Sequence, residues 1–266
     1  LFSLDLRYNT PDVLANAQWN GNIAQMNYLT TKVSAPGTKS FAYTYDKVNR
    51  LTNAVSTANA LDEAISYDVM GNITKLTRGG IGTSQGMLDY TYSGNQLTTV
   101  TGYSARSYQY DPNGNATSDG MGKSIIYNML DLPSEVKQGT TQLATYTYNA
   151  AGQKLQNKSN TENSSGATTW DYVGGIVYKG GQIAFIQTEE GRARPSGSVY
   201  LYEYNLSDHL GNTRVSIDKD PIATTGNTPR IIQEDEYYSF GLRKPTGGYD
   251  LSNNNRYLYN GKEVQT

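Results

Sequence analysis

A short unit that recurs along the chain limits what this sequence can fold into. Each copy has two apolar or aromatic residues at positions i and i+2, then Asp or Asn, then a short turn with Gly or Asn, then an outgoing strand. In the clearest copies the second ring and the residue after it are Tyr45 and Asp46, Tyr67 and Asp68, Tyr110 and Asp111, and Tyr148 and Asn149. Looser copies have Tyr92 before Ser93, Tyr127 before Asn128, and Tyr172 before Val173.

The physical chemistry of this unit favours antiparallel hairpins. Residues i and i+2 of a strand point to the same face, so the two rings of a unit lie on one surface. Asp or Asn can accept hydrogen bonds from the turn backbone, and Gly or Asn accepts a positive φ. The second rings are 17 to 25 residues apart, and no helical period of 3.6 residues accompanies them. We therefore predict an all-β strip of hairpins with aromatic pairs across strands; the best helical signal is one turn at 61–64.

Charge and residue usage exclude several functional classes. The chain has 22 Lys and Arg against 24 Asp and Glu, which does not suit a strongly basic nucleic-acid binder. It has no cysteine and a single histidine, His209, so disulfides, thiolate zinc sites and multi-histidine metal sites are excluded. No apolar run approaches the roughly 18 residues of a membrane helix. We expect no cofactor, no nucleic-acid partner and no membrane insertion.

The sequence changes character after about residue 198. Tyr200, Tyr202 and Tyr204 alternate along one segment, and a loop rich in Pro, Thr and Gly spans about 218–230. Three strings then combine polar and glycine residues: Asp208-His209-Leu210-Gly211-Asn212-Thr213-Arg214, Tyr238-Ser239-Phe240-Gly241, and Tyr257-Leu258-Tyr259-Asn260-Gly261-Lys262-Glu263. These strings keep the strand and turn pattern, but the segments that connect them are longer than those between the earlier units.

Together these residues resemble a known family. The Tyr-Asp-x-x-Gly-Asn units resemble the YD repeats of RHS proteins, and the three later strings resemble the start of the RHS-repeat-associated core domain. The resemblance divides the chain into a repeat strip at 1–198 and the beginning of the core domain at 199–266. The core-motif residues are Asp208, His209, Gly211, Arg214, Gly241 and Gly261. We read the chain as a segment of a longer protein, since the family pattern continues beyond these strings.

The resemblance implies a function of containment. In that family the hairpin strip curls into a hollow shell, and the shell encloses a C-terminal polypeptide that is often a toxin. The implied partners are the remaining shell repeats, the enclosed cargo and secretion machinery, and the implied location is secreted or at the surface of a bacterium. Many members carry an aspartyl autoprotease in the core domain, but the stretch that carries its aspartates is not in this sequence, so no enzyme is expected here. An adhesion or carbohydrate-binding module is the alternative.

Other motif matches are weak. Gly82-Thr83-Ser84-Gln85-Gly86 matches a nucleophile elbow, but it lies between hairpins and the one histidine is far along the chain, so a loop is the better interpretation. Gly80-Ile81-Gly82 lacks the third glycine of a dinucleotide fingerprint. The 111–115 segment resembles a calcium loop but lacks its Gly and Glu, which favours a turn. We expect His209 and Arg214 to have structural roles. The alternative for Arg214 is that it pairs with a carboxylate from the rest of the core domain and supports autoproteolysis there.

Overall fold

The computed structural model describes residues 2–12, 16–30, 37–79, 86–102, 105–161, 166–219, 229–244 and 255–264. The chain divides into two compact units. The first comprises residues 1–105, 206–215 and 233–262, and the second comprises residues 106–205, 216–232 and 263–266. In the part of the chain that is described, no helix is both long enough and apolar enough to cross a membrane.

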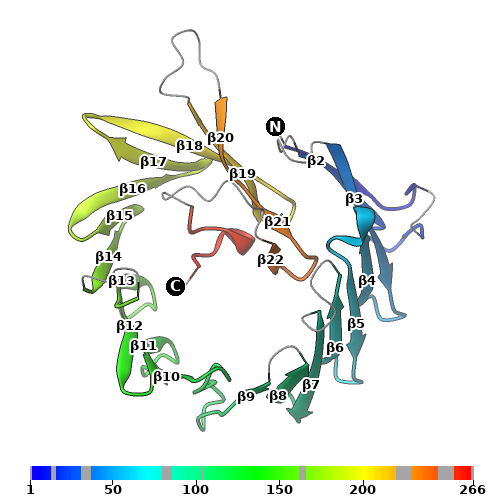
Figure 1. The fold of residues 1–266 in the computed structure, drawn as a ribbon, viewed down its shortest axis with the longest axis horizontal. Helices are drawn as coiled ribbons and strands as arrows, with labels where there is room; N and C mark the ends of the chain where they lie inside the picture. Colours follow the sequence, from blue (N-terminus) through cyan, green and yellow to red (C-terminus); the bar gives the residue numbers. More distant parts are fainter. Residues whose placement is uncertain are drawn as a thin grey trace. The chain divides into compact units, whose positions relative to one another are not determined.

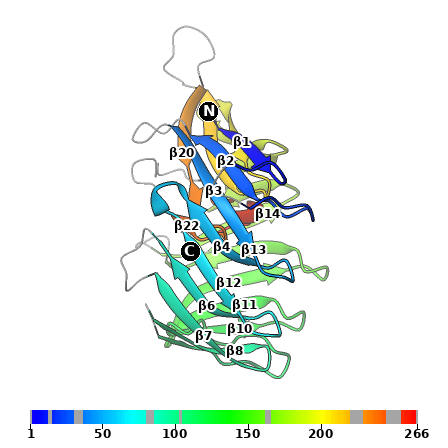
Figure 2. The ribbon, with the colours of Figure 1, turned by 90° about the vertical axis from the view of Figure 1, so that its right-hand side faces the viewer.

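The first unit is a sheet whose strands pair in sequence order, each antiparallel to the next (Figures 1 and 2). Its strands are β1 (Ser3–Arg7), β2 (Gln25–Thr30), β3 (Gly37–Tyr45), β4 (Leu51–Ser56), β5 (Glu63–Tyr67), β6 (Ile73–Arg78), β7 (Met87–Ser93) and β8 (Gln96–Gly102). A 3-10 turn, η1 (Thr57–Asn59), joins β4 to β5.

The second unit repeats this arrangement (Figure 1). It begins with the short β9 (Arg106–Ser107). Its sheet then follows the sequence through β10 (Lys123–Tyr127), β11 (Pro133–Gln138), β12 (Thr141–Tyr148), β13 (Lys154–Ser159), β14 (Thr168–Val173), β15 (Ile176–Lys179), β16 (Gln182–Thr188), β17 (Gly191–Ser196) and β18 (Val199–Ser207).

The last part of the chain contributes to both units. The division between the units falls within β19 (Thr213–Lys219) and within β20 (Pro229–Glu234). A two-stranded sheet of β21 (Glu236–Tyr237) and β22 (Arg243–Lys244) follows in the first unit, together with a 3-10 turn, η2 (Tyr259–Gly261).

The all-β prediction is confirmed. The weak helical signal at 61–64 forms no helix, because Glu63 and Ala64 begin β5 and pair with Arg78 and Thr77 on β6. Glu63 and Ile65 are buried while Ala64 is exposed, so the period of two residues prevails over the weak helical preference.

Both units bury apolar side chains, and those of the first unit form a clustered core. In the first unit, rings from neighbouring strands pack in a row: Tyr28 lies 6.3 Å from Phe41, and Phe41 stacks on Tyr43 at 5.9 Å. In the second unit the buried apolar residues include Trp170, Val177 and Phe185. Burial of aromatic side chains of this size supplies a large part of the apolar stabilisation of a sheet.

Candidate functional site

The repeat turn is the first element of the candidate site, and Asp68 shows its geometry. The Gly71 amide donates to the Asp68 carbonyl (3.2 Å), and the Asp68 amide donates to the Asn72 carbonyl (2.9 Å). Gly71 has φ +92°, and the register shifts by one residue at Tyr67. This is a type I turn followed by a bulge residue with positive φ. The fold therefore places a residue that tolerates positive φ three positions after the aspartate.

The Asp68 side chain completes this turn. Its Oδ1 accepts hydrogen bonds from the amides of Met70 (2.8 Å) and Asn72 (2.9 Å), and its Oδ2 accepts one from the Asn72 side chain (2.9 Å). These bonds favour the carboxylate, with the Asn72 side chain contributing most, and lower the pKa of Asp68. A single acceptor oxygen thus satisfies two turn amides.

The same pair of amide bonds to one side-chain oxygen recurs along the chain. The capping residues are Asp46, Asp68, Asp111, Asp119, Asn128, Asn149 and Asp208. Asn128 and Asn149 perform the same function as aspartate because Oδ1 is the acceptor in both residue types. The Asp119 turn was missed in the sequence because no Tyr-x-Tyr pair precedes it.

In five units the second tyrosine binds the unit to the one before it. The Tyr67 hydroxyl donates to the Leu51 carbonyl (2.7 Å), and Leu51 is the residue that follows the preceding turn. The same bond joins Tyr45 to Ile23 (2.8 Å), Tyr92 to Ile73 (2.9 Å), Tyr127 to Ala116 (2.8 Å) and Tyr148 to Pro133 (2.9 Å). Burial raises the pKa of Tyr45, Tyr67, Tyr127 and Tyr148, which keeps these hydroxyls protonated as donors. We call these five bonds the tyrosine tethers.

The three looser units differ from one another. Asn128 after Tyr127 keeps the repeat turn. Ser93 pairs directly with Gln96 across a two-residue turn, and Val173 pairs with Ile176 in the same way. A residue with a short acceptor side chain is therefore needed for the longer turn, whereas a two-residue turn needs only glycine or asparagine at its tip.

The core-motif residues at 208–214 form another repeat turn. Asp208 accepts from the amides of Leu210 and Asn212 (3.0 Å each), and Gly211 has φ +79°. His209 lies at the exposed tip. The backbone pattern recurs at Tyr238, whose amide donates to the Leu242 carbonyl (2.9 Å) with Gly241 at φ +83°.

The three core strings meet in the first unit. The Thr213 amide donates to the Leu258 carbonyl (3.0 Å), and the Asn260 amide donates to the Asn212 side chain (2.9 Å). A Cβ on Gly241 would lie 2.0 Å from the Tyr259 ring, so only glycine allows the 238–241 turn to approach that ring. Gly261, with φ +63°, is the positive-φ residue of the third string.

Arg214 lies at the centre of this meeting point. Its guanidinium is 4.5 Å from the centre of the Tyr28 ring, 5.7 Å from that of Tyr237 and 5.8 Å from that of Phe2. Nη1 is 3.6 Å from Asp208 Oδ2, and only 4% of the side chain is exposed. The charge is thus held mainly by aromatic faces, with one carboxylate at long range.

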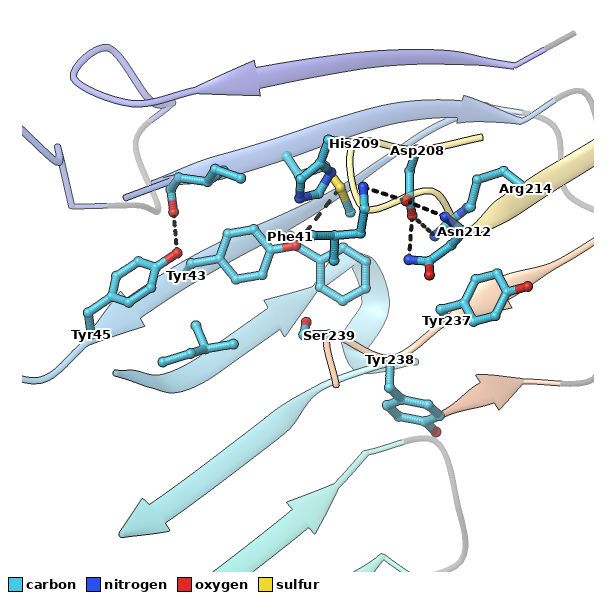
Figure 3. A pocket seen from close by; sticks show the side chains of 14 residues that line it. Phe41, Tyr43, Tyr45, Asp208, His209, Asn212, Arg214, Tyr237, Tyr238 and Ser239 are labelled. Carbon is cyan, nitrogen blue, oxygen red and sulfur yellow. Dashed lines mark hydrogen bonds and ion pairs between the residues drawn. The ribbon is translucent and has the colours of Figure 1, made fainter. Parts of the chain in front are cut away.

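A cavity of about 170 Å³ adjoins Arg214 in the first unit (Figure 3). The turn at Asp208 and Asn212 borders it on one side, and Phe41, Tyr43 and Tyr45 of β3 border it on another. The Tyr43 hydroxyl reaches the Met26 sulfur at 4.0 Å. Burial raises the pKa of Tyr43, which remains a neutral donor.

Comparison with known proteins follows from this geometry. A sequence model of the Teneurin YD-shell matches residues 19–177, which is more than half of the chain. This chain belongs to the Teneurin YD-shell family. The identification of an RHS/YD-repeat protein is therefore confirmed, and the family is a structural shell rather than an enzyme class.

Individual proteins share sequence or fold with this chain. The YD-shell chain is 26% identical over 229 residues to the tRNA3(Ser)-specific nuclease WapA of Bacillus spizizenii, covering 82% of the chain and 9% of WapA. It matches the crystal structure of TcdB2-TccC3-TEV with a TM-score of 0.60 and 15% identity, covering 98% of the chain and 16% of that structure's chain. It matches a Photorhabdus luminescens Tc holotoxin pore with a TccC3 mutation at TM-score 0.60 and 14% identity, with 98% and 16% covered. The YD-shell chain thus spans a small part of each relative, and the two structural matches show the fold alone.

Two buried carboxylates of the YD-shell chain were not predicted from its sequence. Glu63 is fully buried; it pairs with Arg78 (2.8 Å) and accepts from the Phe240 amide (2.8 Å), which fixes the second core string on β5. Glu263 in the second unit pairs with Lys154 and accepts from the Tyr172 hydroxyl (2.8 Å). Tyr172 therefore binds a core-string side chain, whereas the five tethers above bind a backbone carbonyl.

The catalytic and metal interpretations find no supporting geometry in the described residues. No group of three or more His, Asp or Glu residues there could hold a metal ion. Asp111 caps a repeat turn, as the amides of Asn113 (3.0 Å) and Asn115 (2.8 Å) donate to it. The 80–82 string and residues 82–85 of the elbow-like string lie outside the described residues.

Proposed function

We propose that this chain is a wall segment of an exported bacterial shell that encloses a polypeptide cargo, with a toxin as the expected cargo. The observation that carries the proposal is the tyrosine tether. Each tether joins one hairpin to the carbonyl behind the preceding turn, so neighbouring hairpins are held by ladder bonds and also by side chains. A wall built in this way resists local opening, which containment requires.

The division of the chain and its partners belong to the same proposal. Residues 1–198 supply repeats and residues 199–266 begin the core domain, whose second string binds Glu63 of β5 through the Phe240 amide. The partners are further shell repeats, the cargo and the secretion machinery, with secretion or display at the cell surface as the destination.

Protease protection of the cargo tests this function in the full-length protein. We expect the cargo to survive a protease dose that digests the same cargo expressed alone. Replacing Tyr45, Tyr67 and Tyr148 together by Phe removes three tethers and should speed cargo digestion. The matched control replaces the exposed Tyr200, Tyr202 and Tyr204 by Phe and should leave protection unchanged. Equal digestion of enclosed and free cargo would refute containment.

Self-cleavage is a separate property to test. We propose that any autoproteolysis of the full-length protein depends on residues downstream of this segment, because Asp68 and Asp208 cap repeat turns and Asp218 and Asp235 form ion pairs. Replacing Asp68 or Asp208 by Asn should therefore leave self-cleavage of the full-length protein intact. Loss of cleavage in a folded variant would reassign the catalytic group to this chain.

One observation favours glycan binding as a second candidate function. Tyr200, Tyr202 and Tyr204 lie on one face of β18 and are 42%, 56% and 48% exposed. Their partners across the ladder on β17 are Pro195, Ala193 and Gly191, so small side chains flank the three rings. A groove of about 420 Å³ runs along them. Flat aromatic faces with hydroxyl edges suit sugar rings.

A glycan array decides this candidate. We expect selective retention that replacement of the three tyrosines by Ala abolishes and that the Tyr45, Tyr67 and Tyr148 to Phe variant retains. Absence of retention on any glycan, or retention by the Ala variant, would reject it.

A further inference from the structure

Arg214 is a buried cation with an incomplete set of partners. Nη1 is near Asp208 Oδ2 at 3.6 Å, and three aromatic rings surround the guanidinium. Nη2 is fully buried and has no hydrogen-bond partner among the residues that the structure describes. A buried charged group is costly unless it is paired and hydrogen-bonded. Such a group in a native fold therefore requires an explanation.

The Asp208 turn does not supply one. Asp208 already accepts from two amides and from the Asn212 side chain, at 3.0 Å each. Asp111 makes the same three bonds at 2.8–3.0 Å in a turn that has no ion pair among the described residues. The hydrogen bonds of the turn are therefore complete without an arginine. Asp208 interacts with Arg214 only through a long ion pair of 3.6 Å.

The other carboxylates near Arg214 have partners of their own. Asp235 pairs with Arg243 and accepts from the Gln233 side chain (2.6 Å). Glu236 pairs with Lys39; Glu234 has an interaction of its own, while its Oε2 makes no hydrogen bond in the described part of the chain. None of these groups completes the hydrogen bonding of Arg214.

Unfilled polar groups line the adjoining cavity. Among the described residues, Ser239 Oγ is buried and makes no hydrogen bond of good geometry, while the Tyr43 hydroxyl reaches the weak thioether acceptor of Met26 and interacts with the Ser239 side chain. Figure 3 shows Ser239 and the Tyr43 hydroxyl facing each other, with Arg214 at the end that Asp208 and Asn212 form. Met26 and Leu51 contribute apolar side chains to the lining of the cavity. The cavity volume of about 170 Å³ is far larger than the space that one water molecule needs.

We propose that this cavity binds an organic carboxylate with a short apolar body. The carboxylate accepts hydrogen bonds from Arg214, and the body lies among Tyr43, Ser239 and Met26. The N–H groups at the edge of the planar guanidinium can donate to both oxygens of a carboxylate, while the aromatic rings pack on the faces of the guanidinium. The carboxylate comes either from a free small molecule or from a glutamate side chain of another polypeptide. The inference does not depend on the proposed containment function.

Titration of the full chain with matched probes tests the site, with the side-chain N–H signals of Arg214 followed by NMR. Butyrate is the probe, butanamide is its neutral equivalent, and inorganic phosphate is an oxyanion without an apolar body. We expect a saturable shift of the Arg214 signals with butyrate and affinity at least about tenfold weaker for the other two. Comparable affinity for butanamide or tighter binding of phosphate overturns the proposal. It is also overturned if neither butyrate nor the glutamate peptide described below gives a saturable shift.

Two variants separate binding from folding. Arg214→Lys keeps the positive charge but removes the paired N–H donors of the guanidinium. Ser239→Leu fills the cavity and leaves Arg214 in place. Both substitutions should weaken butyrate binding by about tenfold or more. In the lysine variant, binding is measured from the backbone NMR signals of Asn212. Arg50→Lys, in a turn of the same unit, should bind as the wild type does. Unchanged binding by a folded Ser239→Leu variant contradicts the proposed location.

Two capped peptides distinguish the sources of the carboxylate, Ala-Glu-Ala and Ala-Gln-Ala. Binding of the glutamate peptide but not the glutamine peptide assigns the site to a polypeptide side chain. Binding of butyrate alone assigns it to a free small molecule. Equal binding of the two peptides would count against carboxylate recognition.

Discussion

A single oxygen atom distinguishes tyrosine from phenylalanine, and in this chain that oxygen binds one repeat to the next. The Tyr67 hydroxyl donates to the Leu51 carbonyl at 2.7 Å, while the ring receives the Arg50 guanidinium at 4.6 Å. Phenylalanine could fill the same space but would leave a backbone carbonyl without its partner. Five of the 23 tyrosines form such tethers, which none of the four phenylalanines could do.

Replacing Tyr67 by Phe should therefore lower the free energy of unfolding by about 0.5–1.5 kcal/mol, the net contribution of one hydrogen bond. Tyr202→Phe is the matched control, since the Tyr202 side chain is 56% exposed, and its unfolding free energy should not change. Denaturant unfolding of both variants measures the difference. Equal stability of the two variants would show that the tether contributes nothing.

The turn carboxylates make stability depend on pH. Hydrogen bonds from Asn72 and from turn amides lower the pKa of Asp68 in the folded state below its ordinary value of 3.8. Because the folded-state pKa is depressed, this stabilisation is present above pH 4 and is lost as the pH falls through the folded pKa. Asp68→Asn keeps the Oδ1 acceptor, as Asn128 and Asn149 do. Urea unfolding should show a smaller loss of stability on acidification for Asp68→Asn than for the wild type, and identical pH profiles would contradict this.

At the scale of elements, a buried ion pair docks the second core string. Glu63 is fully buried on β5, Arg78 lies on β6 with 15% of its side chain exposed, and the Phe240 amide completes the set. Burial raises the pKa of Glu63, which the Phe240 amide and Arg78 oppose. The position of residues 238–241 thus depends on one strand-borne carboxylate.

Arg78→Met should lower the free energy of unfolding by about 3 kcal/mol because it leaves the Glu63 charge buried and unpaired. Hydrogen exchange at the Phe240 amide should accelerate at the same time. Lys137→Met, which breaks the more exposed pair with Glu135 on β11, is the control and should cost less than about 1 kcal/mol. Slow exchange at Phe240 in Arg78→Met would show that the string docks without this pair.

At the scale of the whole molecule, each unit is built from neighbouring hairpins, and close backbone approaches occur in both. A Cβ on Gly191 of β17 would lie 2.1 Å from the Glu203 carbonyl oxygen in the second unit. A Cβ on Gly102 of β8 would lie 2.1 Å from the Met87 carbonyl oxygen in the first unit. Because each hairpin contacts mainly its neighbours, damage should remain local.

We expect Gly191→Ala to increase hydrogen exchange in the second unit by destabilising it about 1–3 kcal/mol, with the first unit unaffected. Gly102→Ala should have the converse effect, so each variant is the control for the other. Loss of protection throughout the molecule in either variant would indicate that the units unfold as one.

The sequence alone determined the class of structure, because its signals are local. A capping Asp or Asn and a positive-φ residue three positions later lie within one turn, so Asp68 with Gly71 and Asp111 with Gly114 could be recognised directly. Alternation of Tyr43 and Tyr45 likewise indicates a strand without knowledge of its neighbours. The Asp119 turn lacked the tyrosine pair and was missed.

Only the tertiary structure decided which distant groups meet. A tether joins a tyrosine to a backbone carbonyl 11 to 22 positions earlier. Because every residue type has a backbone carbonyl, no sequence motif identifies the acceptor. The rings of Phe2, Tyr28 and Tyr237 around Arg214, and the carboxylates of Glu63 and Glu263, come from segments far apart in the chain. Turn chemistry depends on a few adjacent residues, whereas burial of a charge depends on everything that packs around it.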